Sequence, residues 1–184
     1  MDKILEFQKK MIISKIQEND VCVDLTCGRG NDTLFLAKMC KKVYSFDIQE
    51  EAINSAKEKT KGLDNIVYVL NSHEYVDSYV NESIGVAVYN LGYLPKGDHN
   101  ITTHYEQIKV SLDKVLQILR KKGVIIITCY PGHEEGLKES INLDKYLRKL
   151  NQKEYEVLRY EFINQINNPP YLYIIEKIWD YLLE

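Results

Sequence analysis

Residues 21–33 read VCVDLTCGRGNDT, a short apolar run that ends in an aspartate and leads into a loop with two glycines. From Asn31 onward the apolar residues take a helical spacing, at Leu34, Leu36, Ala37 and Met39. The stretch therefore predicts a strand at Val21–Leu25, a tight loop and a helix that starts at Asn31. Such units build α/β sheets, in which strands and helices alternate along the chain.

The same alternation of strand-like and helical segments continues through most of the chain. The further predicted strands are Val43–Ile48, Ile66–Leu70, Ile84–Leu91 and Gly123–Tyr130. The helices predicted after them are about Glu50–Lys61, a short one after Ser72, about Thr103–Lys121 and about Glu134–Leu150. Another helix precedes the first strand. Five strand–helix repeats predict a parallel sheet with helices on both faces.

The C-terminal segment breaks this alternation. Two strand-like runs, Tyr155–Ile163 and Tyr171–Ile178, are joined only by residues 164–170, which read NQINNPP. Because this link is too short to hold a crossover helix, the two strands should pair antiparallel. Five parallel strands followed by an antiparallel hairpin resemble the layout of the Rossmann-like class I methyltransferases. The predicted fold class is therefore α/β, with a seven-stranded, mostly parallel sheet.

Length and composition predict one globular domain that spans residues 1–184. Domains typically have ~100–200 residues, and a composition of 45% apolar and 28% charged residues excludes wholesale disorder. In residues 1–16, lysines interrupt the apolar positions too often for a signal-peptide core. No other run approaches the ~20 apolar residues of a membrane-spanning helix. We therefore expect a cytoplasmic protein without membrane contact.

The cysteines show no metal-binding spacing. The chain has four of them, Cys22, Cys27, Cys40 and Cys129, and none forms a C-x-x-C pair. Three fall in or beside predicted strands and the loop between them. This distribution favours buried structural thiols over a zinc site or a disulfide framework. We predict no metal ion.

The formal net charge of −3 would repel a polyanion, so a nucleic-acid substrate requires a local basic patch. Three basic clusters are candidates, and each lies near the end of a predicted helix. Cations at such an end interact favourably with the helix dipole, so a solvated helix end is the simpler interpretation of each cluster alone. The clusters are Lys38/Lys41/Lys42, Arg120/Lys121/Lys122 and Lys145/Arg148/Lys149.

The first loop has features of a ligand site. Ligands of such sheets bind beyond the carboxyl ends of the strands, and the two loop glycines let the backbone approach a ligand closely. Asp24 suits a cationic group, such as the α-amino group of a methionine moiety, and would repel a pyrophosphate. A dinucleotide-binding loop has a third small residue at the position of Thr33, so dinucleotide binding is disfavoured. The alternative is an ordinary tight turn with Asn31 or Asp32 as the helix N-cap.

The second and third loops extend this pattern. Asp47 ends the second strand, at the distance where nucleotide-binding folds place a carboxylate for ribose hydroxyls. Its alternative role is the N-cap of the following helix. Residues 71–73 (Asn-Ser-His) supply short polar groups where an adenine edge would lie, although Ser72 also suits a plain N-cap. Taken with the first loop, these residues favour a nucleoside-containing cofactor.

Five segments together resemble one known family. They read DLTCGRGND (24–32), SFDIQ (45–49), NLGYLP (90–95), YPGH (130–133) and NQINNPP (164–170). The first two are common to many class I methyltransferases, whereas the last three are far more specific in combination. The chain resembles the MnmM-type tRNA methyltransferases, long labelled as rRNA methylases, over nearly its whole length.

This resemblance implies S-adenosyl-L-methionine as the cofactor and a tRNA substrate. The implied reaction methylates the exocyclic amine of 5-aminomethyl-2-thiouridine at the wobble position, in the anticodon region, to the 5-methylaminomethyl form. The predicted cofactor-binding residues are Asp24, Thr26, Gly28, Gly30, Asn31, Asp32, Thr33, Asp47, Ile48, Gln49, Ser72, His73 and Asn90. The predicted catalytic residues are Asn90, which would hold the target nitrogen, Tyr93, which is a candidate with Tyr130 to stack on the uridine, and His133, a candidate base or substrate contact.

Other interpretations remain open at this stage. A methyltransferase of this fold can act on rRNA, a protein or a small amine, and the sheet does not distinguish these substrates. A SAM-binding or nucleotide-binding module without catalysis is a second class of function, in which Asn90 would only complete its own turn. His133 has a similar alternative as a solvent-exposed helix-start residue. The sequence leaves the oligomeric state open, a homodimer included.

Overall fold

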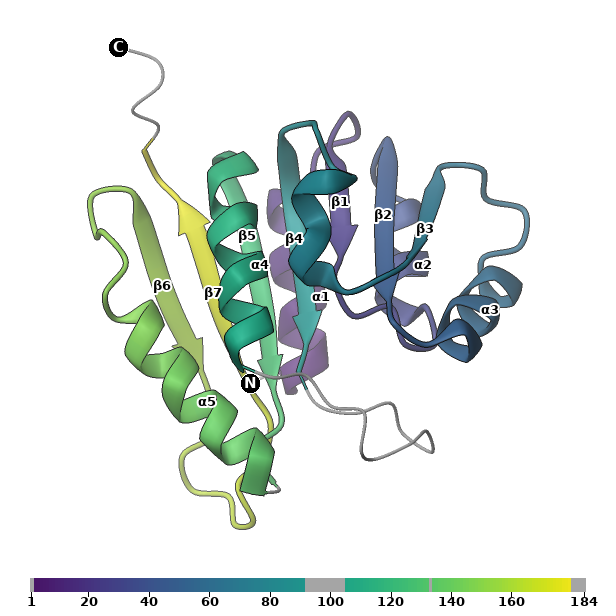
Figure 1. The fold of residues 1–184 in the computed structure, drawn as a ribbon. Helices are drawn as coiled ribbons and strands as arrows, with labels where there is room; N and C mark the ends of the chain where they lie inside the picture. The colour runs from purple at the N-terminus through teal and green to yellow at the C-terminus, as the bar shows by residue number, and fades with distance from the viewer. Residues whose placement is uncertain (1, 92–104, 133, 180–184) are drawn as a thin grey trace.

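The computed structural model describes residues 2–91, 105–132 and 134–179, in which strands and helices alternate (Figure 1). The strands are β1 (Val21–Asp24), β2 (Lys42–Asp47), β3 (Ile66–Leu70), β4 (Ile84–Asn90), β5 (Leu119–Cys129), β6 (Tyr155–Tyr160) and β7 (Tyr171–Lys177). The helices are α1 (Ile4–Lys15), α2 (Asn31–Ala37), α3 (Glu50–Lys59), α4 (Tyr105–Ile118) and α5 (Glu134–Leu147), with a short 3-10 helix, η1 (His73–Ser78).

The strands form one seven-stranded sheet in the order β3-β2-β1-β4-β5-β7-β6 (Figure 1). Neighbours from β3 to β5 pair parallel, while β7 pairs antiparallel with both β5 and β6. The predicted fold class and the C-terminal hairpin are thus confirmed, although β6 ends at Tyr160 and not at Ile163. The strand order reverses between β1 and β4, and open α/β sheets bind their ligands at such a switch point.

The sheet separates two hydrophobic clusters, because successive side chains of a strand point to opposite faces. Within β1, Val21 and Val23 belong to the cluster beneath α4, α5 and η1, whereas Cys22 belongs to the cluster beneath α1 and α2. In Figure 1 these two groups of helices lie on opposite sides of the sheet. All four residues of β1 are buried. This burial on both faces explains why the strand reads as a continuous apolar run.

The boundary between α4 and β5 differs from the prediction. A helix was expected as far as Lys121, but α4 ends at Ile118 and β5 begins with Leu119. Leu119 is buried and pairs with the first residue of β4. Lys122 adopts a φ of 62°, a left-handed conformation that an α-helix of L-residues does not continue. The basic residues 120–122 therefore lie in a strand. The predicted start of the helix, Thr103, lies outside the described residues.

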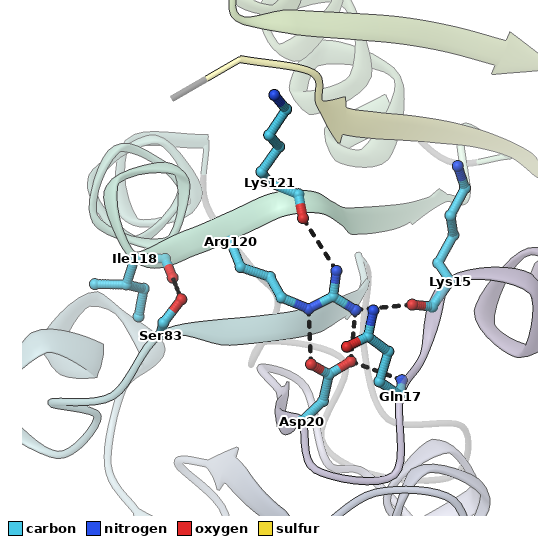
Figure 2. A network of polar contacts seen from close by, with 7 residues as sticks. All are labelled: Lys15, Gln17, Asp20, Ser83, Ile118, Arg120 and Lys121. Carbon is cyan, nitrogen blue, oxygen red and sulfur yellow. Dashed lines mark hydrogen bonds and ion pairs between the residues drawn. The ribbon is translucent and has the colours of Figure 1, made fainter. Parts of the chain in front are cut away.

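A polar network joins the end of α1 to the start of β1 and to β5 (Figure 2). The Arg120 guanidinium donates to both carboxylate oxygens of Asp20 at 2.7 Å, and to the backbone carbonyl of Lys15 at 2.9 Å. Asp20 also accepts the backbone N–H of Gln17 at 2.8 Å. Gly85 leaves room for this pair, since a Cβ there would lie 2.1 Å from Asp20 Oδ2. The network therefore links the end of α1 to the amino ends of β1 and β5.

The four cysteines are buried and free, which confirms the prediction of structural thiols. Cys22 and Cys40 belong to the cluster beneath α1 and α2, and Cys129 to the other. Among the residues that the structure describes, no helix combines the length and the apolar character that a membrane span requires.

Candidate active site

A cavity of about 620 Å³ lies at the carboxyl ends of β1 to β4. The loops that follow β1, β2 and β3 line it, as do Asn90 at the end of β4 and residues of α1 and α2. Most of the predicted cofactor-binding residues come together here, namely Thr26, Gly28, Asn31, Asp32, Asp47, Ile48, Gln49, Ser72, His73 and Asn90. Gln107 and Tyr130 also reach the cavity. The switch point of the sheet is therefore a concave site of ligand size, lined by both apolar and polar side chains.

Asp24 and Thr33 lie behind the residues that line the cavity, and neither side chain is part of the lining. Asp24 is fully buried, and its carboxylate accepts the Thr33 hydroxyl at 2.6 Å and the backbone N–H of Thr26 at 3.2 Å. The Thr33 hydroxyl also lies 2.7 Å from Ser45 Oγ in β2. These contacts fix the loop from beneath. A direct contact of Asp24 or Thr33 with the cofactor stays a prediction.

Burial raises the pKa of Asp24 to about 7, and the nearby charge of Asp32 adds to this effect. Because the folded state holds the proton more tightly, the unfolded carboxyl group ionises first as the pH rises. Ionisation of Asp24 therefore removes stability as the pH rises from about 4 to about 7.

We expect the cofactor-free Asp24→Asn variant to gain stability relative to the wild type across this pH range, because the amide carries no ionisable proton. The gain relative to the wild type should reach ~4 kcal/mol, since the Asp24 pKa rises from 3.8 to about 7 and one pKa unit corresponds to about 1.4 kcal/mol. Urea unfolding of both proteins at a series of pH values measures it. A difference between the two proteins that does not change with pH would contradict a raised pKa of Asp24.

The two loop glycines shape the start of α2. Gly28 and Gly30 have φ values of 50° and 72°, in the left-handed region that favours glycine. Gly30 is the N-cap of α2, and a Cβ at this position would lie 2.7 Å from the Cβ of Ala56 in α3. The alternative in which Asn31 or Asp32 caps the helix is therefore wrong. Both side chains instead line the cavity.

Asp47 joins the first loop to the second. One carboxylate oxygen accepts the backbone N–H of Gly28 at 2.8 Å, and the other accepts that of Gln49 at 3.0 Å. Burial raises the pKa of Asp47, while these amide hydrogen bonds oppose the rise. The N-cap of α3 is Gln49, so Asp47 is not the cap. Each oxygen keeps lone-pair capacity for a hydroxyl donor in the cavity.

We expect Asp47→Ala to weaken the binding of S-adenosylhomocysteine by ~1–3 kcal/mol, because ribose hydroxyls would lose a charged acceptor. Calorimetric titration of the purified variant measures the affinity. Asp64→Ala removes an exposed carboxylate outside the cavity and serves as the control. If Asp47→Ala binds as tightly as the wild type, Asp47 does not contact the ribose and only joins the two loops.

The third loop places a neutral imidazole in the cavity. His73 is buried, and burial lowers its pKa to about 4, so the ring is uncharged at neutral pH. In the described part of the chain, His73 Nδ1 is a buried side-chain atom without a hydrogen-bond partner. Ser72 caps η1, since its hydroxyl accepts the backbone N–H of Glu74 at 3.4 Å. The alternative role of Ser72 as an N-cap is confirmed, its contact with a cofactor stays a prediction, and His73 keeps a polar atom for a ligand.

Asn90 ends β4, and hydrogen bonds hold both its backbone and its side chain. Its backbone N–H donates to the Thr26 hydroxyl at 2.6 Å, which ties β4 to the first loop. Its side-chain Nδ2 donates to Asp32 Oδ2 at 2.7 Å. A carboxylate only accepts hydrogen bonds, so this contact fixes which end of the amide is nitrogen. The carbonyl oxygen, Oδ1, is therefore the end turned away from Asp32.

The remaining predicted residues divide between described and undescribed segments. Tyr130, after β5, lines the cavity and is exposed to solvent. Tyr93 and His133 lie outside the described residues, so their catalytic roles stay predictions. Of the basic clusters, only Lys38 lines the cavity. Other members form ion pairs at 2.6–2.7 Å: Lys42 with Glu82, Arg120 with Asp20 and Arg148 with Asp144.

Sequence reasoning missed the contribution of α1. Gln8 of this helix lines the cavity and is buried. The signal is its position, because Ile4, Gln8 and Ile12 are spaced four residues apart and share one face of the helix. Ile12 is fully buried and Ile4 packs against the same cluster. A polar residue within such a buried stripe requires hydrogen-bond partners and marks a candidate site residue.

A family model described as "Putative rRNA methylase" matches residues 43–176. The chain belongs to this family. A solved structure of a "putative rRNA-methylase" from Clostridium thermocellum is 36% identical and superimposes with a TM-score of 0.94 over 97% of this chain and 99% of the other. A methyltransferase structure from Streptococcus mutans, in complex with SAH, is 34% identical, with a TM-score of 0.91 and coverage of 96% and 99%.

A curated relative names a more specific substrate. The chloroplastic tRNA (mnm(5)s(2)U34)-methyltransferase of Arabidopsis thaliana is 28% identical over 88% of this chain, and the match spans 65% of that longer protein. The family resemblance and the methyltransferase fold predicted from the sequence are confirmed. With them, the enzyme class and its cofactor, S-adenosylmethionine, are confirmed at the level of the family.

Proposed function

We propose that this protein methylates the exocyclic amine of 5-aminomethyl-2-thiouridine at the wobble position of tRNA, with S-adenosylmethionine as the methyl donor. The orientation of the Asn90 amide carries the proposal. Its Nδ2 is held on Asp32 at 2.7 Å, so Oδ1 is the atom left for the reacting group. A carbonyl oxygen accepts N–H donors, and a primary amine supplies them. The relation to the Arabidopsis enzyme supports this substrate.

The lining of the cavity fits the proposed cofactor. Asp47 offers acceptor capacity for ribose hydroxyls, and His73 Nδ1 and Ser72 offer polar atoms for an adenine edge. Leu25, Phe46 and Ile48 supply apolar surface in the same cavity. When bound, S-adenosylmethionine supplies an electrophilic methyl group on a sulfonium. This chain would then provide binding and orientation, which are the main requirements of an in-line methyl transfer.

The target amine must be neutral when it attacks, since protonation removes its lone pair. Asn90 Oδ1 accepts an N–H of this neutral amine and thereby fixes the direction of the nitrogen lone pair. The exposed Tyr130 would stack on the uridine ring, as aromatic side chains do on unstacked RNA bases. Tyr93 and His133 stay candidates for a second aromatic contact and for a base.

Mass spectrometry of tRNA nucleosides tests this proposal. A strain that lacks the gene should accumulate 5-aminomethyl-2-thiouridine and lack its methylated product. Purified protein with S-adenosylmethionine should convert the tRNA of that strain, and the Asn90→Ala variant should do so about 100-fold more slowly. A deletion strain with an unchanged tRNA nucleoside profile would contradict the proposed substrate.

Ribosomal RNA is the second candidate substrate, because the family description names an rRNA methylase. The same deletion strain separates the two candidates. Loss of a methylated nucleoside from rRNA, with tRNA unchanged, would favour ribosomal RNA. The salt dependence of RNA affinity then tests whether cationic side chains such as Lys38 contact phosphates, since such contacts weaken as salt rises.

A further inference from the structure

Gln8 of α1 is a buried polar residue whose partners lead directly to Asn90. It is only 1% exposed. Its Nε2 donates to Asp32 Oδ2 at 3.3 Å, and its Oε1 accepts the Thr128 hydroxyl at 3.4 Å. The same oxygen of Asp32 accepts Asn90 Nδ2 at 2.7 Å. Hydrogen bonds therefore connect β5, α1 and α2 to the end of β4.

We propose that Gln8 is a positioning residue for the methyl acceptor, an inference that rests on the proposed function. The Thr128 hydroxyl donates to Gln8 Oε1, so the Gln8 amide turns its N–H toward Asp32. Asp32 is then held between two amide donors. It fixes the Asn90 amide with Oδ1 toward the target amine.

The order of these bonds explains why a distant helix affects the reaction. Without Gln8, the Asp32 carboxylate loses one of its two amide donors and gains freedom to rotate. Asn90 would then sample orientations in which Oδ1 no longer meets the amine. Misplacement of an orienting group lowers the rate of the bound complex and leaves binding of the cofactor largely unchanged.

Gln8→Leu tests this inference with tRNA from a strain that lacks the gene as the substrate. We expect kcat to fall by about 10-fold or more, because catalysis by orientation is sensitive to small displacements. The KM for this tRNA and the affinity for S-adenosylhomocysteine should change by less than about 3-fold, as expected for a residue that acts on the transition state alone. Lys10→Met, on the exposed side of the same helix, should keep the wild-type kcat. An unchanged kcat, or a matching loss of S-adenosylhomocysteine affinity, would overturn the role of Gln8.

Thr128→Val provides a second variant that keeps the shape of the core. Thr128 is buried, and it is absent from the lining of the cavity, so its hydroxyl reaches the site through Gln8. Thr128→Val should lower kcat less than Gln8→Leu does. The double variant should be no slower than Gln8→Leu alone, because both changes break one chain of contacts. If the rate losses of the two single variants multiply in the double variant, Thr128 and Gln8 do not act along one path of hydrogen bonds.

NMR of the Asn90 side-chain amide tests the network without any substrate. Its nitrogen-15 resonance is assigned by its loss in Asn90→Ala. Gln8→Leu should shift this resonance and speed the exchange of its protons with water, and Lys10→Met should do neither. An Asn90 amide that is unaffected by Gln8→Leu would overturn the inference. Wild-type protein that methylates no tRNA would instead overturn the proposed function and leave the NMR result standing.

Discussion

The Asn90→Ala variant should methylate tRNA about 100-fold more slowly than the wild type, because catalysis by orientation loses its main acceptor for the amine. Its affinity for S-adenosylhomocysteine should stay close to that of the wild type. The predicted cofactor contacts lie mainly in the loops after β1, β2 and β3, and among them Asp32 is the residue that the Asn90 side chain contacts. Asp32 also keeps its contact with Gln8 in this variant. Single-turnover methylation, calorimetry and thermal melting on the same preparation measure the three quantities.

A purely structural Asn90 predicts a different pattern. If its side chain only completes a turn, Asn90→Ala should lose ~1 kcal/mol of stability, and the rate should fall only with the fraction of folded protein. Asn54→Ala, at an exposed position of α3, controls for the loss of an asparagine side chain in general. A variant that melts and binds S-adenosylhomocysteine like the wild type, and also methylates tRNA at the same rate, would remove Asn90 from the site.

Local patterns predicted the order of strands and helices well, because most strands contain an apolar run bounded by loop residues. The antiparallel hairpin followed from the short link at residues 164–170 alone. The end of α4 could not be predicted in this way. Helical spacing continues past Ile118, and the change to a strand depends on the pairing of Leu119 with β4 and on the ion pair of Arg120 with Asp20. Both are long-range contacts that a local pattern does not contain.

In the candidate site, too, local patterns predicted some features, while others depend on long-range contacts. Residues at strand ends were predicted because parallel strands bring their carboxyl ends to one edge of the sheet. The sequence did not indicate that Asp24 is fully buried while Asp47 lines the cavity, although both end a strand. That difference arises because Thr33 and the loop backbone cover Asp24. Nor did it place Gln8 next to Asp32, since this contact depends on the packing of α1 against the sheet.

The Arg120→Met variant should lose about 3–5 kcal/mol of stability, the usual cost when one partner of a buried ion pair is removed. Asp20 is 7% exposed, and the variant leaves its carboxylate with the Gln17 N–H as a remaining donor. In Figure 2, the guanidinium of Arg120, a residue of β5, joins Asp20 to the backbone carbonyl of Lys15, the last residue of α1. Urea unfolding followed by circular dichroism measures the free energy of unfolding.

Two further variants test why Arg120→Met loses stability. The cause is either the unpaired, buried charge of Asp20 or a general loss of packing around Arg120. Lys121→Met changes the neighbouring lysine and should lose no more than ~1 kcal/mol of stability, because it removes only a cation that lies 4.9 Å from the centroid of the Trp179 ring. Adding Asp20→Asn to Arg120→Met should restore part of the lost stability, because no unpaired charge then remains buried while the amide oxygen still accepts the Gln17 N–H. The S-adenosylhomocysteine affinity of the folded variants should match the wild type, since this network lies at the amino end of β1 and the cavity at its carboxyl end. A double variant less stable than Arg120→Met alone would show that the side chains, and not the charge of Asp20, determine the loss.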